Sequence, residues 1–352
     1  MRVLKISRDQ LKKWLDELSG TVDLYVPMPA GKQVHRFEPY TTFEELDLSY
    51  TRTVLPPKKF VFPPEEVLFN RAPSGETTVP DLPARDLVLF GVHPCDINGI
   101  RILDTFFSSF DKPDWYYQRR RARLRIVGLS CLPDEHCFCR SMDCDSAASG
   151  FDLFFHDIDP ENQDRGEKVF FVSLGTVEGD IMLADRADTL PEAEPEELEA
   201  LLEYTERRES AYTLDLDPSI LPQAIKLHQA DPLWDRLGEQ CLACGVCSLG
   251  CPTCTCFNIR DTNDLEGGSS RVRNWDACLY RDFARVAGDH NFRPHRSERI
   301  QNRYYHKQVG FAEAFGKPSC VGCGRCIKLC PTGIHFVEVF QSLARERLPV
   351  DE

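Results

Sequence analysis

Two cysteine-rich runs near the end of the chain constrain its fold more than any other feature. Residues 241–252 read C-L-A-C-G-V-C-S-L-G-C-P, and residues 320–331 read C-V-G-C-G-R-C-I-K-L-C-P. Both runs have the spacing C-x2-C-x2-C-x3-C-P, which is the bacterial spacing for ligands of a [4Fe–4S] cluster. Three thiolates must reach three corners of one small cube, so the backbone has to wrap tightly. Gly245, Gly322 and Gly324 permit this wrap.

The last cysteine of each run indicates how the two runs relate. In proteins with two such clusters, the fourth cysteine of a run binds the cluster of the other run. The expected ligands are Cys241, Cys244, Cys247 and Cys330 for the first cluster, and Cys251, Cys320, Cys323 and Cys326 for the second. This crossing would join residues 236–352 into one dicluster domain of the α+β, ferredoxin-like type.

Two other uses of the cysteines fit the spacing less well. Zinc knuckles present two C-x2-C pairs separated by a longer loop, rather than four cysteines in eleven residues followed by proline. Disulfides are typical of small secreted scaffolds, and residues 1–7 lack the apolar core of a signal peptide. Sixteen cysteines in a chain of this kind therefore indicate metal binding.

The bulk properties exclude several classes of function. The 352 residues are enough for two or three domains, and the net charge is −14. Such an acidic chain is a poor partner for nucleic acid, whose phosphates require a basic face. No stretch approaches the length that spans a bilayer, so the protein is expected to be cytoplasmic, without a membrane span.

The first half of the chain alternates apolar strand patterns with helical patterns. Residues 86–90 and 125–130 are near-continuous apolar runs, as in buried parallel strands. Residues 1–190 are therefore expected to form an α/β domain, in which functional groups gather at the carboxyl ends of the strands. Four cysteines follow these two strands, and we expect them to hold a third cluster: Cys95, Cys131, Cys137 and Cys139.

Alternatives for this third group stay open, because its spacing is not standard. A zinc site, a redox-active pair or inert thiols could each account for the cysteines. His93 and His136 flank the group and could replace one thiolate as a ligand, although structural histidines are more common. Cys144 has no assigned role.

The remaining segments are expected to be connections. Residues 191–235 are acidic and form a helical bridge, whereas residues 257–319 form a helical insertion in the dicluster domain. Residues 51–60 are too rich in proline for regular structure, so a surface loop is expected. Three cysteines between the two runs have no partner in the scheme, and buried thiols are a simpler explanation than another metal: Cys254, Cys256 and Cys278.

Motifs for substrate chemistry are missing from the chain. There is no G-x-G-x-x-G after a strand, no Walker loop and no G-x-S-x-G. No C-x2-C pairs are placed as a nickel–iron active site requires. The sequence favours an electron-transfer subunit of a larger complex over two alternatives, an enzyme that uses the N-terminal cysteines on a substrate and a scaffold stapled by iron.

Several of these stretches together resemble one family. G-V-H-P-C-D at residues 91–96 and C-F-C at residues 137–139, combined with the two cluster runs, resemble the beta subunit of cytosolic nickel–iron sulfhydrogenases, which are NAD(P)-linked hydrogenases. The equivalent electron-transfer subunit of anaerobic sulfite reductase is similar in the same regions, as are iron–sulfur subunits of flavin oxidoreductases linked to heterodisulfide reductase. The resemblance extends over residues 51–60, 91–105, 128–139, 150–156 and 275–278.

This resemblance implies a function in anaerobic metabolism. The chain would relay electrons, within a hetero-oligomer, between a flavin or NAD(P)H-oxidising partner and a catalytic, hydrogenase-like subunit. The family pattern also implies the third cluster on the four N-terminal cysteines. Cys144 departs from that pattern.

Overall fold

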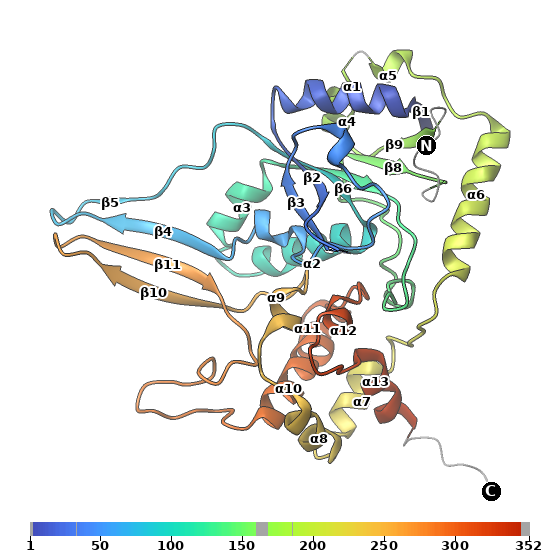
Figure 1. Ribbon diagram of the computed structural model, residues 1–352. Coiled ribbons are helices and arrows are strands. Elements are labelled where there is room, and N and C mark those ends of the chain that lie inside the picture. Colours follow the sequence, from blue (N-terminus) through green and yellow to red (C-terminus); the bar gives the residue numbers. More distant parts are fainter. Residues whose placement is uncertain (1–2, 33, 160–167, 185, 346–352) are drawn as a thin grey trace, which may run out of the picture.

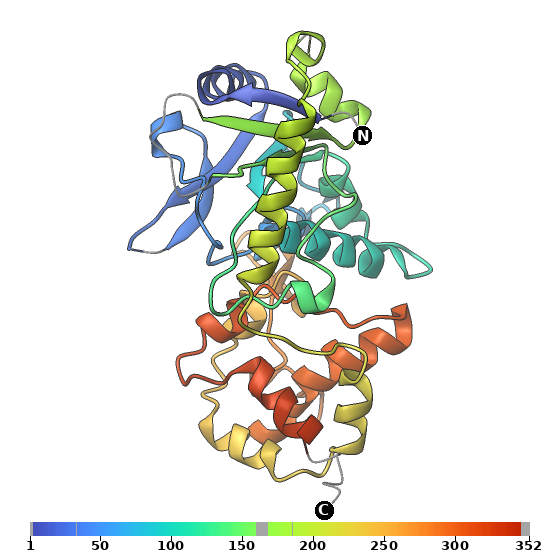
Figure 2. The same cartoon turned by 90° about the vertical axis from the view of Figure 1, so that its right-hand side faces the viewer.

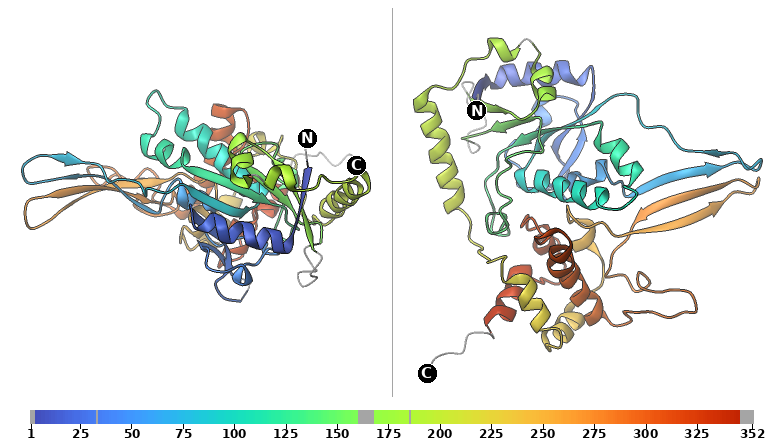
Figure 3. Two further views of the ribbon diagram at one scale, coloured as in Figure 1. Left: turned by 90° about the horizontal axis from the view of Figure 1, so that it is seen from above. Right: turned by 180° about the vertical axis from the view of Figure 1, so that it is seen from behind.

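The computed structural model describes residues 3–32, 34–159, 168–184 and 186–345. The chain forms an N-terminal lobe built on a sheet and a C-terminal lobe built mostly from helices (Figure 1). Helix α6 (Pro195–Ser210) runs along one side and leads from the first lobe to the second (Figure 2). A narrow arm of strands projects from the opposite side (Figures 1 and 3).

The N-terminal lobe contains a seven-stranded sheet in the order β1–β9–β8–β7–β6–β2–β3. The four central strands are parallel: β2 (Asp23–Pro29), β6 (Leu87–Val92), β7 (Leu124–Leu129) and β8 (Leu153–His156). The outer strands pair antiparallel: β1 (Val3–Ser7), β9 (Val169–Leu174) and β3 (His35–Pro39). The two expected buried strands are therefore the neighbours β6 and β7.

Helices cover both faces of this sheet. Helix α1 (Arg8–Ser19) begins with a capping box in which Ser7 and Gln10 exchange side-chain to backbone hydrogen bonds, and its apolar stripe packs on one face. Helices α2 (Pro94–Ser108) and α3 (Trp115–Arg121) pack on the other face. Shorter elements complete the lobe: η1 (Phe43–Glu45), η2 (Pro57–Phe60), α4 (Val177–Leu183) and α5 (Arg186–Thr189).

The arm is a second, antiparallel sheet in the order β10–β11–β4–β5. It combines strands of both halves of the chain: β4 (Glu65–Arg71), β5 (Thr77–Thr78), β10 (Phe257–Asn263) and β11 (Ser269–Trp275). The insertion at 257–319 is therefore only partly helical, because its first part is a hairpin. All seven positions of β10 are exposed, so its sequence lacks the alternation of buried and exposed residues that would predict a strand. Its hydrogen-bonded pairing with β11 defines it as a strand.

The C-terminal lobe encloses its own apolar core. Its helices are α7 (Leu221–Leu227), α8 (Leu233–Gln240), α9 (Val246–Leu249), α10 (Arg296–Tyr305), the π-helix η4 (His306–Gly310), α11 (Phe311–Phe315), α12 (Arg325–Lys328) and α13 (Phe336–Arg345). Helix α7 packs against η4 and α13, so this part of the expected bridge shares the core of the lobe. Phe138 of the N-terminal lobe enters the same core and stacks on Phe336.

Candidate iron–sulfur centres

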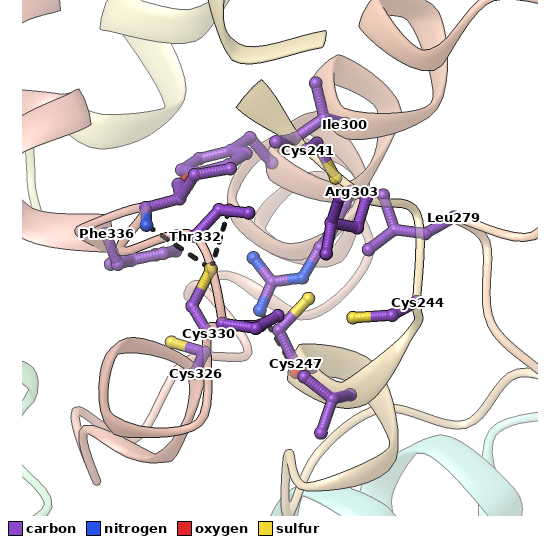
Figure 4. A pocket seen from close by; sticks show the side chains of 15 residues that line it. Cys241, Cys244, Cys247, Leu279, Ile300, Arg303, Cys326, Cys330, Thr332 and Phe336 are labelled. Carbon is purple, nitrogen blue, oxygen red and sulfur yellow. Dashed lines mark hydrogen bonds between the residues drawn. The ribbon is translucent and has the colours of Figure 1, made fainter. Parts of the chain in front are cut away.

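The first expected ligand set surrounds one cavity of the C-terminal lobe. Cys241, Cys244 and Cys247 line this cavity together with Cys330 of the second run. Figure 4 shows the sulfur atoms of these four side chains turned toward the same space. Cys326 also lines the cavity, but its sulfur points away from the other four (Figure 4). Cys330 of the second run thus lies beside the first three cysteines of the first run, as the crossed scheme expects.

The local backbone explains how these cysteines gather. Helix α8 ends directly before Cys241, and Gly245 has a φ of 75° that starts the single turn of α9. The backbone N–H of Ala243 donates to the Cys241 sulfur at 3.3 Å, and the N–H of Ile334 donates to the Cys330 sulfur at 3.3 Å. Donors aimed at sulfur stabilise a thiolate, which is the form that binds iron.

The second expected set lies beside the first. Burial is the main cause that raises the pKa of Cys326 to about 12, and the neighbouring thiolates of Cys320 and Cys251 contribute in the same direction. Lys307 is buried and directs its Nζ at the Cys251 sulfur, 3.4 Å away. Burial likewise raises the pKa of Cys323, with Cys251 among the contributing charges. Cysteines of the two runs therefore gather here as well.

Four N-terminal cysteines come together at the carboxyl edge of the main sheet. Because β6 and β7 are parallel neighbours, Cys95 in the first turn of α2 lies near Cys131, just beyond β7. Cys137 and Cys139 are buried in one apolar cluster, and Cys95 packs against the same cluster. Burial, followed by the charges of Cys95 and Cys137, raises the pKa of Cys131. The four expected residues of the third group are thus neighbours.

Unpaired polar atoms surround this third group. Arg52 forms an ion pair with Asp134 and places its Nη2 at 3.0 Å from the Cys137 sulfur, while its buried Nε and Nη1 have no partner. His93 donates from Nδ1 to the Thr51 carbonyl at 3.0 Å, which leaves a lone pair on its buried, unpaired Nε2. Buried polar atoms without partners are costly. Cluster sulfides would accept hydrogen bonds from the unpaired N–H groups of Arg52, which already contacts the Cys137 sulfur, so this part of the site fits a cluster.

The backbone that carries the third group packs directly against the backbone of the second cluster run. The backbone N–H of Phe138 donates to the Gly322 carbonyl at 2.8 Å. Gly322 has a φ of 65°, and a Cβ added there would lie 2.4 Å from the Phe138 carbonyl oxygen. Gly324 has a φ of 72°, and its Cβ would lie 2.4 Å from the His136 carbonyl oxygen. Glycine at both positions lets the two backbones meet.

Comparison with known proteins agrees with this arrangement. The model of a 4Fe–4S dicluster domain matches residues 240–334. The chain is 38% identical to sulfhydrogenase 2 subunit beta of Pyrococcus furiosus over 343 residues, which are 97% of this chain and 98% of that protein. The chain belongs to the sulfhydrogenase beta subunit family. The resemblance inferred from the motifs is confirmed, and so is the presence of a dicluster domain.

Cys144, which had no assigned role, occupies a defined place in this sulfhydrogenase-family chain. Burial raises the pKa of Cys144 to about 12, and the charges of Cys95 and Cys320 contribute to the shift. It is buried in the apolar cluster against which Cys95 and Cys320 both pack. The Nε2 of His136 lies 3.4 Å from a carboxylate oxygen of Glu135, and the ring is partly exposed, in contrast to the buried His93.

Several basic residues of the site were missed at the level of sequence. Residues 51–60 were expected to form a surface loop, and this expectation is wrong, because Lys58 is 2% exposed. Its Nζ donates to the Cys254 carbonyl at 2.9 Å and lies 4.3 Å from the centre of the Trp275 ring. The partners are about 200 positions away in the chain, so no local pattern could reveal them.

The described part of the chain contains neither a site for a single metal ion nor a helix that could span a membrane. Within residues 3–32, 34–159, 168–184 and 186–345, no three His, Cys, Asp or Glu side chains converge on the position of a single ion. A cubane requires a different geometry, because each thiolate binds its own iron at one corner of a cube. None of the described helices combines the length and the apolar character that crossing a bilayer requires.

Proposed function

We propose that this chain is the electron-relay subunit of a hydrogenase-type complex, with three [4Fe–4S] clusters. Cys241, Cys244, Cys247 and Cys330 would hold the first, Cys251, Cys320, Cys323 and Cys326 the second, and Cys95, Cys131, Cys137 and Cys139 the third. Each cluster, when bound, can take up and give back one electron. The partners would be a flavin or NAD(P)H-oxidising protein and a catalytic subunit with the hydrogenase site.

The observation that carries this proposal is that the segments with the three cysteine groups adjoin one another. The Phe138–Gly322 hydrogen bond joins the third group's segment to the second run, and Cys326 of the second set lines the cavity of the first. Electron transfer weakens steeply with distance, so centres held on adjoining segments suit a relay. The order that these contacts support is third, second, first.

Buried cations support the same function. Lys307 lies beside Cys251, Arg52 beside Cys137, and Arg303 donates to the Cys247 carbonyl at 3.2 Å from a buried position. Clusters with four thiolates are anionic, so these cations offset their charge in a low dielectric. Hydrogen bonds and charges near the sulfurs are also what sets a reduction potential. Each cation would therefore influence the reduction potential of the cluster nearest to it.

Iron content and turnover test the proposal. The purified chain should contain about twelve irons, since each cubane holds four. Cys139→Ser should leave about eight, while the matched variant Cys144→Ser, of another buried cysteine nearby, should keep about twelve. The isolated chain should become paramagnetic on reduction without converting hydrogen or NAD(P)H. Hydrogen turnover by the isolated chain would contradict the proposal.

One observation favours a second candidate, an enzyme that uses the N-terminal cysteines on a substrate. A cavity of about 460 Å³ lies beside the third group and is lined in part by Arg52, Asp134 and Lys328. Arg52 and Asp134 both contact Cys137, so a ligand in this cavity would approach that thiol. Under this alternative the chain would hold about eight irons and carry titratable N-terminal thiols.

The cell compartment and the assembly belong to the same proposal. Twelve of the sixteen cysteines are assigned to iron clusters, and thiolates of this kind persist in a reducing compartment, so we place the protein in the cytoplasm. Its P. furiosus relative is by name one subunit of an assembly. Co-purification of this chain with flavin-containing and hydrogenase subunits would support the hetero-oligomer, and purification as a lone, fully iron-loaded chain would contradict it.

A further inference from the structure

Three cysteines outside the proposed ligand sets share a cavity in the C-terminal lobe. Cys254, Cys256 and Cys278 line it, together with the buried cations Arg303 and Lys307. Arg303 also lines the cavity of the first ligand set, so it separates the two spaces. These thiols therefore lie next to the relay without belonging to it.

The base of the β10–β11 hairpin brings two of these cysteines to the same place. Phe257 and Trp275 face each other at the end of the ladder, and the N–H of Asp276 donates to the Cys256 carbonyl at 3.0 Å. Cys278 follows Asp276 by two residues, and its side chain lines the same cavity as that of Cys256. The ladder therefore holds the two cysteines on neighbouring backbone segments, as a disulfide requires.

The surroundings connect this pair to both expected clusters of the dicluster domain. Arg303, which lines the cavity, donates to the carbonyl of Cys247 at 3.2 Å. Lys307, which also lines it, places its Nζ 3.4 Å from the Cys251 sulfur. One cation therefore lies between the cavity and a ligand of the first set, and another between the cavity and a ligand of the second.

We propose that Cys256 and Cys278 form a reversible disulfide that stores two electrons beside the relay. On reduction the S–S bond breaks, and each sulfur takes up one electron and one proton. The two electrons come from two reduced [4Fe–4S] clusters, each oxidised by one electron, and the two protons come from water. Oxidation of the two thiols runs the same steps backwards. The inference rests on the proposed function only for the source of the electrons.

The nature of the site suits this exchange. Clusters of this type pass one electron at a time, whereas a dithiol takes up two, so a pair beside two clusters can join one-electron and two-electron steps. Lys58 places its Nζ 2.9 Å from the Cys254 carbonyl oxygen, and Lys307 and Arg303 line the cavity, so cationic groups lie beside these thiols. The two sulfurs need no other protein group to form their bond.

Trapping of thiols tests the inference directly. The full, iron-loaded chain is treated anaerobically with diamide, its free thiols are alkylated, and peptides are analysed by mass spectrometry, with iron counted at each step. A cross-linked peptide joining Cys256 to Cys278 is expected, and it should be absent in Cys256→Ser and in Cys278→Ser. Both variants should keep the iron content of the parent chain. Cys144→Ser, the matched control, should leave the cross-link unchanged.

The second part of the test is reduction of the disulfide by electrons that enter through the clusters. Electrochemically reduced methyl viologen should convert the disulfide to two thiols, and this conversion should slow at least tenfold in Cys330→Ser. Thiols that stay free under diamide while the iron is retained would overturn the inference. Loss of about four irons in Cys256→Ser would also overturn it, by making the residue a cluster ligand. A reversible cross-link in a chain with fewer than twelve irons would instead support the pair and count against the proposed three-cluster relay.

Discussion

Arg325 and Asp96 form a bidentate ion pair, with both N–O distances at 2.7 Å and each side chain 1% exposed. Arg325 begins helix α12 inside the second cluster run, and Asp96 follows Cys95 in α2. The Nε of Arg325 also donates to the carbonyl of Thr53 at 2.8 Å. One side chain therefore ties together the dicluster lobe, the sheet lobe and the segment that carries Arg52.

Removal of one charge of this pair should destabilise the protein strongly. Asp96→Asn leaves the guanidinium of Arg325 buried without a counter-charge, and we expect a loss of about 3–5 kcal/mol in unfolding free energy. The matched control is Asp261→Asn, because Asp261 forms a bidentate pair with Arg271 in which both side chains are about half exposed. That change should lose far less stability, because solvent screens an exposed ion pair. Denaturant unfolding under anaerobic conditions measures both, and equal losses would contradict the prediction.

The crossed ligand sets predict which cluster is lost when a given cysteine is replaced. Cys330→Ser should remove the cluster of the 241–247 run and leave the cluster of the 320–326 run, since Cys330 lines the first cavity. About four of twelve irons should be lost, along with one of the paramagnetic signals of the reduced protein. Cys244→Ser should remove the same signal. The crossing is wrong if Cys330→Ser instead gives the spectrum of Cys323→Ser.

Close backbone contact at Gly324 predicts a position-specific effect of alanine. Gly324 and Gly316 both have a left-handed φ, of 72° and 80°, so alanine costs about 1–2 kcal/mol at either position. Only at Gly324 would the new Cβ meet a backbone oxygen, that of His136 at 2.4 Å, whereas at Gly316 nothing lies within 4 Å. Gly324→Ala should therefore lose more thermal stability, and should also disturb the third cluster. Equal melting temperatures would argue against the contact.

Burial of His156 predicts a dependence of stability on pH. Burial lowers the pKa of His156 to about 4, from about 6.5 in the unfolded chain. Between these values the unfolded chain binds a proton that the folded chain does not. Stability should therefore be fully present above pH 6.5 and fall as the pH decreases toward 4, by up to about 1.4 kcal/mol per pH unit.

A variant isolates this contribution. His156→Gln should flatten the pH dependence between about pH 6.5 and 4, because glutamine does not titrate there. His290→Gln, at an exposed position, should leave the slope of the parent protein. Melting temperatures measured across this range under anaerobic conditions report the slopes, and acid effects on the clusters are common to all three proteins. Parallel slopes for His156→Gln and the parent would contradict the prediction.

The chemistry of the site could be predicted from the sequence where its cause is local. The spacing of residues 241–252 and 320–331 specifies the wrap around a cubane, because three ligands of each cluster lie within seven residues. Cys95 and Cys131 could be placed together because both follow apolar runs, and parallel neighbours end at the same edge of a sheet. The strands β6 and β7 are such neighbours.

Contacts between distant segments were decided by the tertiary structure alone. Nothing near Lys58 or Arg52 in the sequence indicates that their charges turn inward, because the cysteines that they contact come from other parts of the chain. The same reason applies to β11, which pairs with β4 across about 200 residues, and to Cys256, which shares a cavity with Cys278 at the base of the β10–β11 hairpin. Spacing along the chain determines how a cube is held, whereas packing between segments determines which charges and thiols surround it.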